Sequence, residues 1–497
     1  MTIRTRFAPS PTGYLHVGGL RTALYAYCFA KKNEGKFVLR IEDTDRERFV
    51  ADGTQNILKS LYWAGLIPDE GVMFDNEENI IQKGDCGGSY IQSERSDIYR
   101  EHADRLIEQG HAYHCFCAPE RLDELRQFQQ LNKLPTGYDG HCREINPIEA
   151  QKRASDGEKH VIRMKMPKEG ETVFNDEIRG EVRFKNELID DQVIMKSDGF
   201  PTYHLAVVVD DHLMKITHII RGEEWLSSVP KHLQLYKYFG WESPKMAHLP
   251  LLLNADKSKL SKRQGDVAVE DYVKKGYLKE AIINFIAFLG WNPGGEREIY
   301  SLDEIINEFN FDKVGKSGAI FNLQKLDWFN REYLKKMDLA ELVQRAKEFL
   351  LADPEIFSAI GEGQYEDKDL ARVIALERER VTTFSELPEA LKFVFVLPKY
   401  KSDLLIWKKS SVDELQNILP GLKDLLSTIS VQSWDRTILE RTVGDWVKEK
   451  GYSVGSVLWP MRVALSGQEN SPGPFEIAEV LGKEESLNRI DLAISNI

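Results

Sequence analysis

Hydrophobic positions alternate with polar ones at the start of the chain and then change to a helical period. The alternation over residues 3–7 predicts a strand. Residues 20–32 have the spacing of a helix, and this run stops at Gly35, a residue type that often follows a helix end. A second strand is predicted at 36–41. This order predicts a βαβ unit, which is half of a doubly wound parallel sheet.

The rest of the chain divides by the same patterns. Strand and helix patterns alternate to about residue 110, and residues 111–190 interrupt them with short alternating stretches such as 160–166. The α/β pattern then resumes, with a strand at 217–220, a helix at 229–239 and a strand within 245–253. Beyond about residue 270, helical spacing dominates at 278–289, 339–351, 370–379, 412–419 and 422–429, with Pro388, Pro398 and Pro420 as expected boundaries. We therefore expect an α/β region with an insertion, followed by a mostly α-helical region.

Composition agrees with a chain of several domains. The small number of cysteines, five in the whole chain, together with the lack of a signal segment, favours a reducing compartment. The 497 residues are 42% hydrophobic and 29% charged, which is ordinary for a globular protein. No apolar run approaches about 18 residues, and the first residues lack a signal core, so we expect no membrane association and a cytoplasmic location. The net charge of −13 argues against nonspecific nucleic-acid binding. It still permits RNA contacts through local basic patches.

Two segments far apart in the sequence suggest phosphate chemistry. The first is Ser10-Pro11-Thr12-Gly13-Tyr14-Leu15-His16-Val17-Gly18-Gly19, between the first strand and the first helix. The second is Lys259-Leu260-Ser261-Lys262-Arg263. A small-residue turn before a helix lets backbone N–H groups approach an anion, and the helix N-terminus favours phosphate. Two lysines and an arginine around a serine suit a loop that holds a triphosphate. Each segment alone is a weak signal, but together they point to adenylyl transfer from ATP.

With further motifs, these segments resemble the class I aminoacyl-tRNA synthetases and, within them, the bacterial-type glutamyl-tRNA synthetases. The resemblance rests on Arg6-Phe7-Ala8-Pro9-Ser10-Pro11-Thr12-Gly13, Arg40-Ile41-Glu42-Asp43-Thr44-Asp45, Ser197-Asp198-Gly199-Phe200-Pro201-Thr202-Tyr203-His204-Leu205-Ala206 and Arg221-Gly222-Glu223-Glu224-Trp225. It runs nearly end to end and is dense over residues 1–270.

The resemblance implies a Rossmann-type catalytic domain with an inserted acceptor-binding domain, followed by a helical anticodon-binding region. The two halves of the catalytic domain would be residues 1–110 and 191–270, and the inserted acceptor-stem domain would be 111–190. A stem-contact domain at 271–335 would precede two anticodon-binding helical domains at 336–398 and 399–497. The helical C-terminal region agrees with the bacterial rather than the archaeal or eukaryotic cytosolic branch.

The resemblance also assigns roles in ATP binding. His16, Lys259 and Lys262 would be catalytic, and ATP would contact His16, Gly18, Gly19, Lys259, Ser261, Lys262 and Arg263. Gly19 departs from the class signature, which has a second histidine there. Mg²⁺ is expected with ATP, carried mainly by phosphates and water.

A pocket for glutamate follows from the same motifs. The substrate-binding residues would be Arg6, Ala8, Ser10, Glu42, Tyr203, Arg221, Glu224 and Trp225. Arg6 and Arg221 would bind the side-chain carboxylate, because a guanidinium can bind a carboxylate through two parallel hydrogen bonds. Tyr203 would donate a hydroxyl, Glu42 would pair with the ammonium, and Ser10 would contact the main-chain carboxylate. Two arginines favour a carboxylate over the amide of glutamine.

Three of the five cysteines cluster in the insertion and suggest a structural Zn²⁺ site. Cys115, Cys117 and Cys142 supply three thiols. By resemblance to zinc-bearing relatives, Tyr138 ranks first as the fourth ligand, ahead of His141 and Glu144. The alternative is three reduced cysteines without metal, since other members of the family lack zinc.

The resemblance therefore implies a monomeric enzyme of the glutamyl-tRNA synthetase family, a glutamate–tRNA ligase. Its substrates would be L-glutamate, ATP and tRNA(Glu), and glutamyl-adenylate would be the intermediate. The alternatives are an enzyme that also charges tRNA(Gln), a glutaminyl-tRNA synthetase, and a non-catalytic RNA-binding paralogue.

Overall fold

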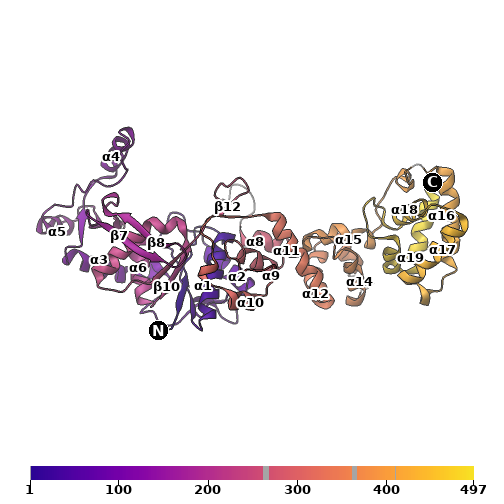
Figure 1. Cartoon of the computed structure of the whole chain (residues 1–497), viewed down its shortest axis with the longest axis horizontal. Helices are drawn as coiled ribbons and strands as arrows, with labels where there is room; N and C mark the ends of the chain where they lie inside the picture. The colour runs from indigo at the N-terminus through magenta and orange to yellow at the C-terminus, as the bar shows by residue number, and fades with distance from the viewer. Residues whose placement is uncertain (1, 261–267, 361–365, 409) are drawn as a thin grey trace. The chain divides into compact units, whose positions relative to one another are not determined.

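The computed structural model describes residues 2–260, 268–360, 366–408 and 410–497. The chain forms two compact units, which are described separately. Unit 1 comprises Met1–Tyr272 and Ile282–Leu323, and unit 2 comprises Val273–Ala281 and Gln324–Ile497. Unit 1 is an α/β structure, and the described residues of unit 2 form helices joined by loops (Figure 1).

The described residues of unit 1 form an eight-stranded sheet in the order β4-β3-β2-β1-β10-β11-β7-β8. Neighbouring strands are parallel from β3 to β7, and the hairpin partners β4 and β8 are antiparallel edges. The strands are β1 (Arg4–Phe7), β2 (Lys36–Leu39), β3 (Glu70–Phe74), β4 (Ile80–Lys83), β7 (Glu171–Asp176), β8 (Gly180–Lys185), β10 (His218–Gly222) and β11 (Lys245–Leu249).

The predicted βαβ unit at the start of the chain is confirmed. β1 pairs in parallel with β2, and α1 (Val17–Lys32) connects them. The helix begins three residues before the predicted start, so Gly18 and Gly19 lie in its first turn rather than before it. His16 explains the earlier start, because its side chain accepts a hydrogen bond from the N–H of Gly19 and caps the helix.

A second, three-stranded sheet belongs to the predicted insertion and its flank. It consists of β5 (Ala112–Cys115), β6 (Val161–Met164) and β9 (Val193–Met195), all antiparallel. The hairpin β7–β8 lies within the same stretch of sequence, yet it extends the main sheet through the pairing of Asp176 with Met246 on β11. The alternating pattern of β7 and β8 predicts a half-exposed hairpin. It does not show which sheet the hairpin joins, because that depends on pairing with a distant segment of the chain.

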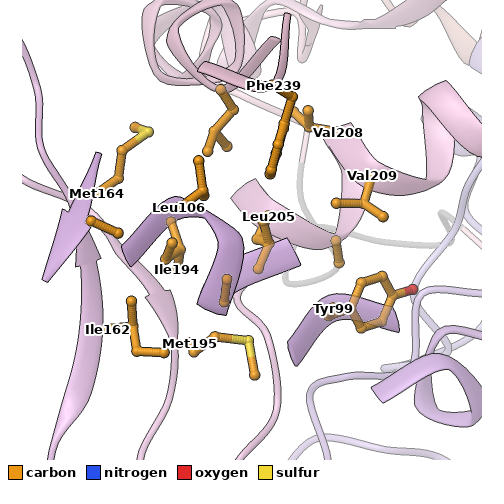
Figure 2. Close-up of a cluster of buried hydrophobic side chains, with 14 of the residues drawn as sticks. Tyr99, Leu106, Ile162, Met164, Ile194, Met195, Leu205, Val208, Val209 and Phe239 are labelled. Carbon is orange, nitrogen blue, oxygen red and sulfur yellow. The ribbon is translucent and has the colours of Figure 1, made fainter. Parts of the chain in front are cut away.

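Unit 1 contains further helices besides α1. They are α2 (Gly53–Trp63), α3 (Ser96–Glu108), α4 (Pro119–Leu131), α5 (Pro147–Ser155), α6 (Tyr203–Leu213), α7 (Val229–Phe239) and α10 (Leu302–Glu308). Figure 2 shows a buried cluster in which side chains of α3, α6, β6 and β9 gather, with Phe239 of α7 beside them. Leu106, Leu205 and Ile194 in this cluster are fully buried. The cluster therefore fixes α6, which carries Tyr203 and Asp211, against the smaller sheet.

Unit 2 confirms the prediction of a mostly helical C-terminal region. Its helices include α12 (Leu339–Leu351), α13 (Pro354–Ala359), α14 (Asp367–Glu377), α15 (Leu387–Phe395), α16 (Val412–Ser427), α17 (Arg436–Lys450), α18 (Val454–Ser466) and α19 (Pro474–Ser495). Three further helices, α8 (Val269–Lys274), α9 (Lys279–Ala287) and α11 (Leu323–Lys336), are on the stretch of chain where the two units alternate.

One predicted helix boundary is wrong. Pro420 was expected to separate two helices, but α16 continues through it. A proline inside a helix removes one hydrogen bond. Leu419 and Leu422, on either side of Pro420, are both fully buried, and this burial outweighs the local preference of proline. Among all the residues described, no helix is both long and apolar enough to span a membrane.

Candidate active site

The cavity of unit 1 lies where several parallel strands of the main sheet end. It has a volume of about 1010 Å³. In open α/β sheets, ligands bind in the crevice outside the carboxyl ends of the strands. The cavity is lined by every predicted ATP or glutamate residue that the structure describes, namely Arg6, Ala8, Ser10, His16, Gly18, Gly19, Glu42, Tyr203, Arg221, Glu224, Trp225 and Lys259. The predicted contacts Ser261, Lys262 and Arg263 lie outside the described residues.

The first motif presents a helix N-terminus to this cavity. His16 precedes α1, and its Nδ1 accepts from the N–H of Gly19 at 3.1 Å. A neutral imidazole with Nδ1 as acceptor carries its proton on Nε2, so the cap fixes the tautomer. A Cβ at Gly19 would lie 2.8 Å from Leu15 Cδ1, so a larger residue at this position would require the Leu15 side chain to shift.

Lys259 belongs to a short β-bridged turn beside the first motif. Its partner in the bridge is Leu253, and the N–H of Leu260 donates to the carbonyl of Leu252 at 2.9 Å. The Lys259 side chain is exposed and lines the cavity. The backbone that carries the Lys259 side chain is therefore fixed by its hydrogen bonds to residues 252–253 of unit 1.

A buried network of charges lies beneath the cavity, and most of its residues lie outside the motifs predicted to form the site. Asp211 accepts from Arg6 Nε at 3.2 Å and from Arg40 Nη1 at 2.7 Å, and Arg40 Nη2 also donates to Glu42 at 2.8 Å. Burial alone would raise the pKa of Asp211, but the two arginines outweigh it and the pKa is lowered. Asp211 therefore stays ionised and fixes Arg6.

The neighbouring Asp210 neutralises a further arginine. It accepts from Arg95 at 2.8 Å, from Gln92 at 2.9 Å and from the hydroxyl of Tyr99 at 2.8 Å. Two adjacent carboxylates inside the apolar run of α6 were the sequence signal for this network, since buried charges require partners. Each of the arginines of the network thus faces a carboxylate.

Arg221 differs from these arginines, because its hydrogen-bond partners in the described part of the chain carry no negative charge. Its Nε donates to His248 at 3.1 Å, and its Nη1 donates to the Tyr203 hydroxyl at 2.8 Å and to His232 Nδ1 at 3.4 Å. Within the described residues, the buried Nη2 has no hydrogen-bond partner. Arg221 is 5% exposed. A buried guanidinium without a carboxylate partner is costly and calls for an anionic ligand.

Arg6 and Glu42 complete this part of the cavity. Within the described residues, the Arg6 side chain donates hydrogen bonds through Nε alone, to Asp211. Its two Nη groups are therefore available to a ligand. Both hydrogen bonds from Arg40 reach Oε1 of Glu42, which leaves Oε2 as an acceptor. Burial raises the pKa of Glu42 against the opposing effect of Arg40. A cationic group bound at Oε2 would favour the ionised carboxylate. The arrangement can hold a carboxylate and an ammonium at once.

The histidines behind Arg221 give a testable pH dependence. Burial, with the charge of Arg221 as the next cause, lowers the pKa of His232 well below 6.5. An unfolded histidine takes up a proton below about pH 6.5 while His232 stays neutral, so stability is lost as the pH falls through this range. Replacing His232 with Gln should therefore flatten the pH dependence of the free energy of unfolding below pH 6.5, by up to about 1.4 kcal/mol per pH unit.

Urea unfolding at pH 7.5, 6.5 and 5.5 measures this dependence. The exposed His141, replaced with Gln, is the matched control and should keep the wild-type slope. Parallel pH profiles for wild type and His232→Gln would contradict the assignment.

The cysteine cluster in the insertion is a candidate metal centre. The sulfurs of Cys115, Cys117 and Cys142 lie within 4.8 Å of one another. The Tyr138 hydroxyl lies 3.4 Å from Cys115 Sγ and 3.6 Å from Cys117 Sγ. Tetrahedral zinc with bonds of about 2.3 Å holds its sulfurs about 3.8 Å apart. The 3.5 Å between the Cys117 and Cys142 sulfurs is close to this value.

The other proposed fourth ligands do not share this geometry. The side chain of Glu144 is 91% exposed and lies 3.9 Å from Arg143. His141 is also exposed. The Nε of Arg163 donates to Cys115 Sγ at 3.4 Å, which supports a negatively charged sulfur. The donor set fits a small thiophilic cation.

Fold and cavity together define a class I tRNA synthetase. The sequence profile described as "tRNA synthetases class I (E and Q), catalytic domain" matches residues 2–328, and an anticodon binding domain profile matches residues 341–494. The chain belongs to the glutamate–tRNA ligase family. It is 46% identical to the glutamate–tRNA ligase of Chloroherpeton thalassium, with 100% of this chain and 98% of that relative covered. The corresponding ligase of Finegoldia magna is 45% identical, with 99% of each chain covered.

Solved structures agree with the family and the fold. A glutamate tRNA ligase from Elizabethkingia meningosepticum, crystallised in complex with its amino acid, matches with a TM-score of 0.86 and 36% identity, covering 100% of this chain and 99% of that one. A glutamate-tRNA synthetase from Elizabethkingia anophelis matches with a TM-score of 0.85 and the same identity, covering 100% of both chains. The sequence prediction of family and fold class is therefore confirmed.

Proposed function

We propose that the chain activates L-glutamate with ATP and transfers the glutamyl group to the 3′-terminal adenosine of tRNA(Glu). The observation that carries this proposal is the buried Arg221. Among the described residues, its Nη2 has no hydrogen-bond partner, and the groups that accept from its other nitrogens are neutral. Such a site favours a side chain with a negative charge at its end. Family membership supports the overall reaction.

Glutamate would be held at both ends. Arg221 and Arg6 would bind the side-chain carboxylate, with a hydrogen bond from Tyr203. Burial raises the pKa of the Tyr203 hydroxyl, which therefore remains a donor at neutral pH. Glu42 would pair with the ammonium, and Ser10 would contact the main-chain carboxylate. Ala8, Glu224 and Trp225 would shape the remaining wall, and the Trp225 ring lies 4.3 Å from the Tyr203 ring.

The main-chain carboxylate of glutamate would attack the α-phosphorus of ATP and expel pyrophosphate. Such a reaction depends on positioning and on stabilising charge on the phosphoryl oxygens. The N-terminus of α1, with Gly18 and Gly19 in its first turn, supplies N–H groups, and His16 and Lys259 supply donors. We keep Ser261, Lys262 and Arg263 as predicted triphosphate contacts, with Mg²⁺ carried by the phosphates.

We further propose that Cys115, Cys117, Cys142 and Tyr138 bind one structural Zn²⁺. The distances between the sulfurs and the hydroxyl support this donor set. None of these four residues lines the cavity, so the metal would stabilise the insertion rather than act on substrate.

Metal analysis of the purified protein tests the zinc proposal. Plasma mass spectrometry should find one zinc per chain, and the Tyr138→Phe variant should bind it at least roughly 10-fold more weakly in a chelator competition. The His141→Ala and Glu144→Ala variants serve as matched controls and should retain wild-type affinity. Zinc-free protein of full stability, or loss of metal on replacing His141 but not Tyr138, would contradict the proposed ligand set.

The helical unit 2 would bind the anticodon, as the match to an anticodon binding domain supports. All five cysteines are free, which agrees with a reducing compartment, and we propose a cytoplasmic monomer. The non-catalytic RNA-binding alternative is disfavoured, because the charged residues of the cavity are intact.

Aminoacylation with radiolabelled glutamate and ATP tests the function. Purified tRNA(Glu) and tRNA(Gln) transcripts should be assayed separately, with radiolabelled glutamine as the competing amino acid. We expect tRNA(Glu) to accept glutamate. Charging with glutamine would instead identify a glutaminyl-tRNA synthetase, and charging of neither amino acid by folded protein would favour the RNA-binding paralogue. Glutamylation of tRNA(Gln) as well would show a non-discriminating ligase.

A further inference from the structure

Three adjacent strands of the main sheet place a buried histidine–aspartate pair behind Arg221. Arg221 on β10 and His248 on β11 are register partners, and Asp176 ends the next strand, β7. His248 and Asp176 are 0% and 1% exposed, and neither of them lines the cavity. The hydrogen bond between Arg221 and His248, and the one between His248 and Asp176, therefore act from the side opposite a ligand.

The hydrogen bonds assign the proton on His248. Arg221 is always charged and only donates, so the contact of its Nε with His248 Nε2 makes this nitrogen an acceptor. The other ring nitrogen, Nδ1, then carries the proton and donates to Asp176 Oδ2 at 2.6 Å. Burial lowers the pKa of His248, with Asp176 opposing. His248 is thus a neutral imidazole whose lone pair points at Arg221.

Asp176 is itself fixed by its own turn. Its Oδ1 accepts from the backbone N–H groups of Ile178 and Arg179, both at 3.0 Å, and from that of His248 at 3.3 Å. Burial alone would raise the pKa of Asp176, but the hydrogen bonds from His248 and the backbone lower it. With Oδ1 occupied, Oδ2 is directed at the imidazole.

The chain therefore holds two arginines of one pocket in two different ways. Arg6 contacts the carboxylate of Asp211 directly. Arg221 instead donates to a neutral acceptor, the imidazole of His248. The carboxylate of Asp176 accepts from the other side of this imidazole and does not contact Arg221 directly. A carboxylate in direct contact would satisfy the guanidinium internally and weaken its demand for an anionic ligand.

We infer that Asp176 and His248 are positioning residues that set the preference of the pocket for a carboxylate over an amide side chain, by holding Arg221 through a neutral acceptor. This inference rests on the proposed function of Arg221 as the receptor of the glutamate side chain. It adds two residues that lie outside every motif quoted above and that do not touch the substrate.

Substitutions at His248 separate positioning from folding. In His248→Glu, a carboxylate reaches Arg221 directly. We expect the ratio of kcat/KM for glutamate over glutamine to fall at least roughly 100-fold, with the KM for ATP changed less than about 3-fold. In His248→Gln, a neutral acceptor is kept near the position of Nε2. This variant should therefore retain most of the wild-type ratio of kcat/KM for glutamate over glutamine. Asp176→Asn, which weakens the orientation of the ring, should raise the KM for glutamate by roughly 10-fold.

His218→Glu is the matched control, because His218 lies at the start of the same strand β10, is also buried and does not line the cavity. The His218→Glu variant should keep the wild-type ratio. Thermal unfolding of every variant would test that it is folded. A third variant, His248→Leu, removes the acceptor altogether. The inference would be overturned by an unchanged kcat/KM ratio in His248→Glu, or by an equal fall of this ratio in His248→Gln and His248→Leu. If wild-type protein charges no glutamate at all, the proposed function itself fails, which is a different outcome.

Discussion

Replacing Arg221 with glutamine should lower kcat/KM for glutamate by roughly 10²- to 10⁴-fold while the KM for ATP changes less than about 3-fold. Breaking a buried ion pair by removing one partner costs about 3–5 kcal/mol, because the other charge stays buried without compensation. In the proposed complex, this uncompensated charge would be the glutamate side chain. ATP would bind elsewhere in the cavity, near His16 and Lys259. Aminoacylation kinetics with each substrate varied in turn measure the two effects.

Two further variants sharpen the Arg221 prediction. Arg221→Lys keeps the charge but loses the planar fork, so its loss should be intermediate. Arg183→Gln, at an exposed arginine on β8, is the control and should behave as wild type. Equal losses for glutamate and ATP in Arg221→Gln would contradict the assignment of this arginine to the amino-acid pocket.

Replacing Lys259 with methionine should lower the rate of adenylate formation by roughly 10²- to 10³-fold, with the KM for glutamate little changed. Removing one preorganised donor from a developing negative charge typically has an effect of this size on kcat. Lys259 lines the cavity on a bridged turn, so the side chain is lost without disturbing a buried core. Pyrophosphate exchange in the presence of tRNA(Glu) measures the step.

Lys257 provides the matched control for Lys259. It is also exposed, lies two residues earlier on the same turn and does not line the cavity. Lys257→Met should therefore leave pyrophosphate exchange unchanged. A similar loss in both variants would mean that the turn tolerates no substitution, and wild-type exchange by Lys259→Met would remove Lys259 from the proposed mechanism.

The sequence predicted the parts of the fold and site that depend on local patterns. The alternation at residues 3–7 and the helical run after it gave β1 and α1, because strand and helix periods differ. The motif around His16 predicted an anion site, because it precedes a helix whose N-terminal N–H groups favour phosphate. Arg6, Glu42, Tyr203 and Arg221 were found through their motifs, and the structure brings them to one cavity.

Pairing between distant segments could not be predicted in this way. The position of Asp176 depends on β7 joining β11, and no local pattern states that pairing. The contact of His248 with Arg221 depends on a second pairing, the register of β10 against β11. The ion pairs of Asp211 required knowledge of which arginines approach α6, although two acidic residues in an apolar helix already indicated a buried network.

Binding of two non-reactive adenylate analogues tests the central claim most directly, namely that the pocket selects a carboxylate side chain. Isothermal titration calorimetry would compare glutamyl-sulfamoyl-adenosine with glutaminyl-sulfamoyl-adenosine, which differ at the side-chain terminus alone. The uncompensated Arg221 predicts that the glutamyl analogue binds at least roughly 100-fold more tightly. Equal affinity for the two analogues would contradict the account.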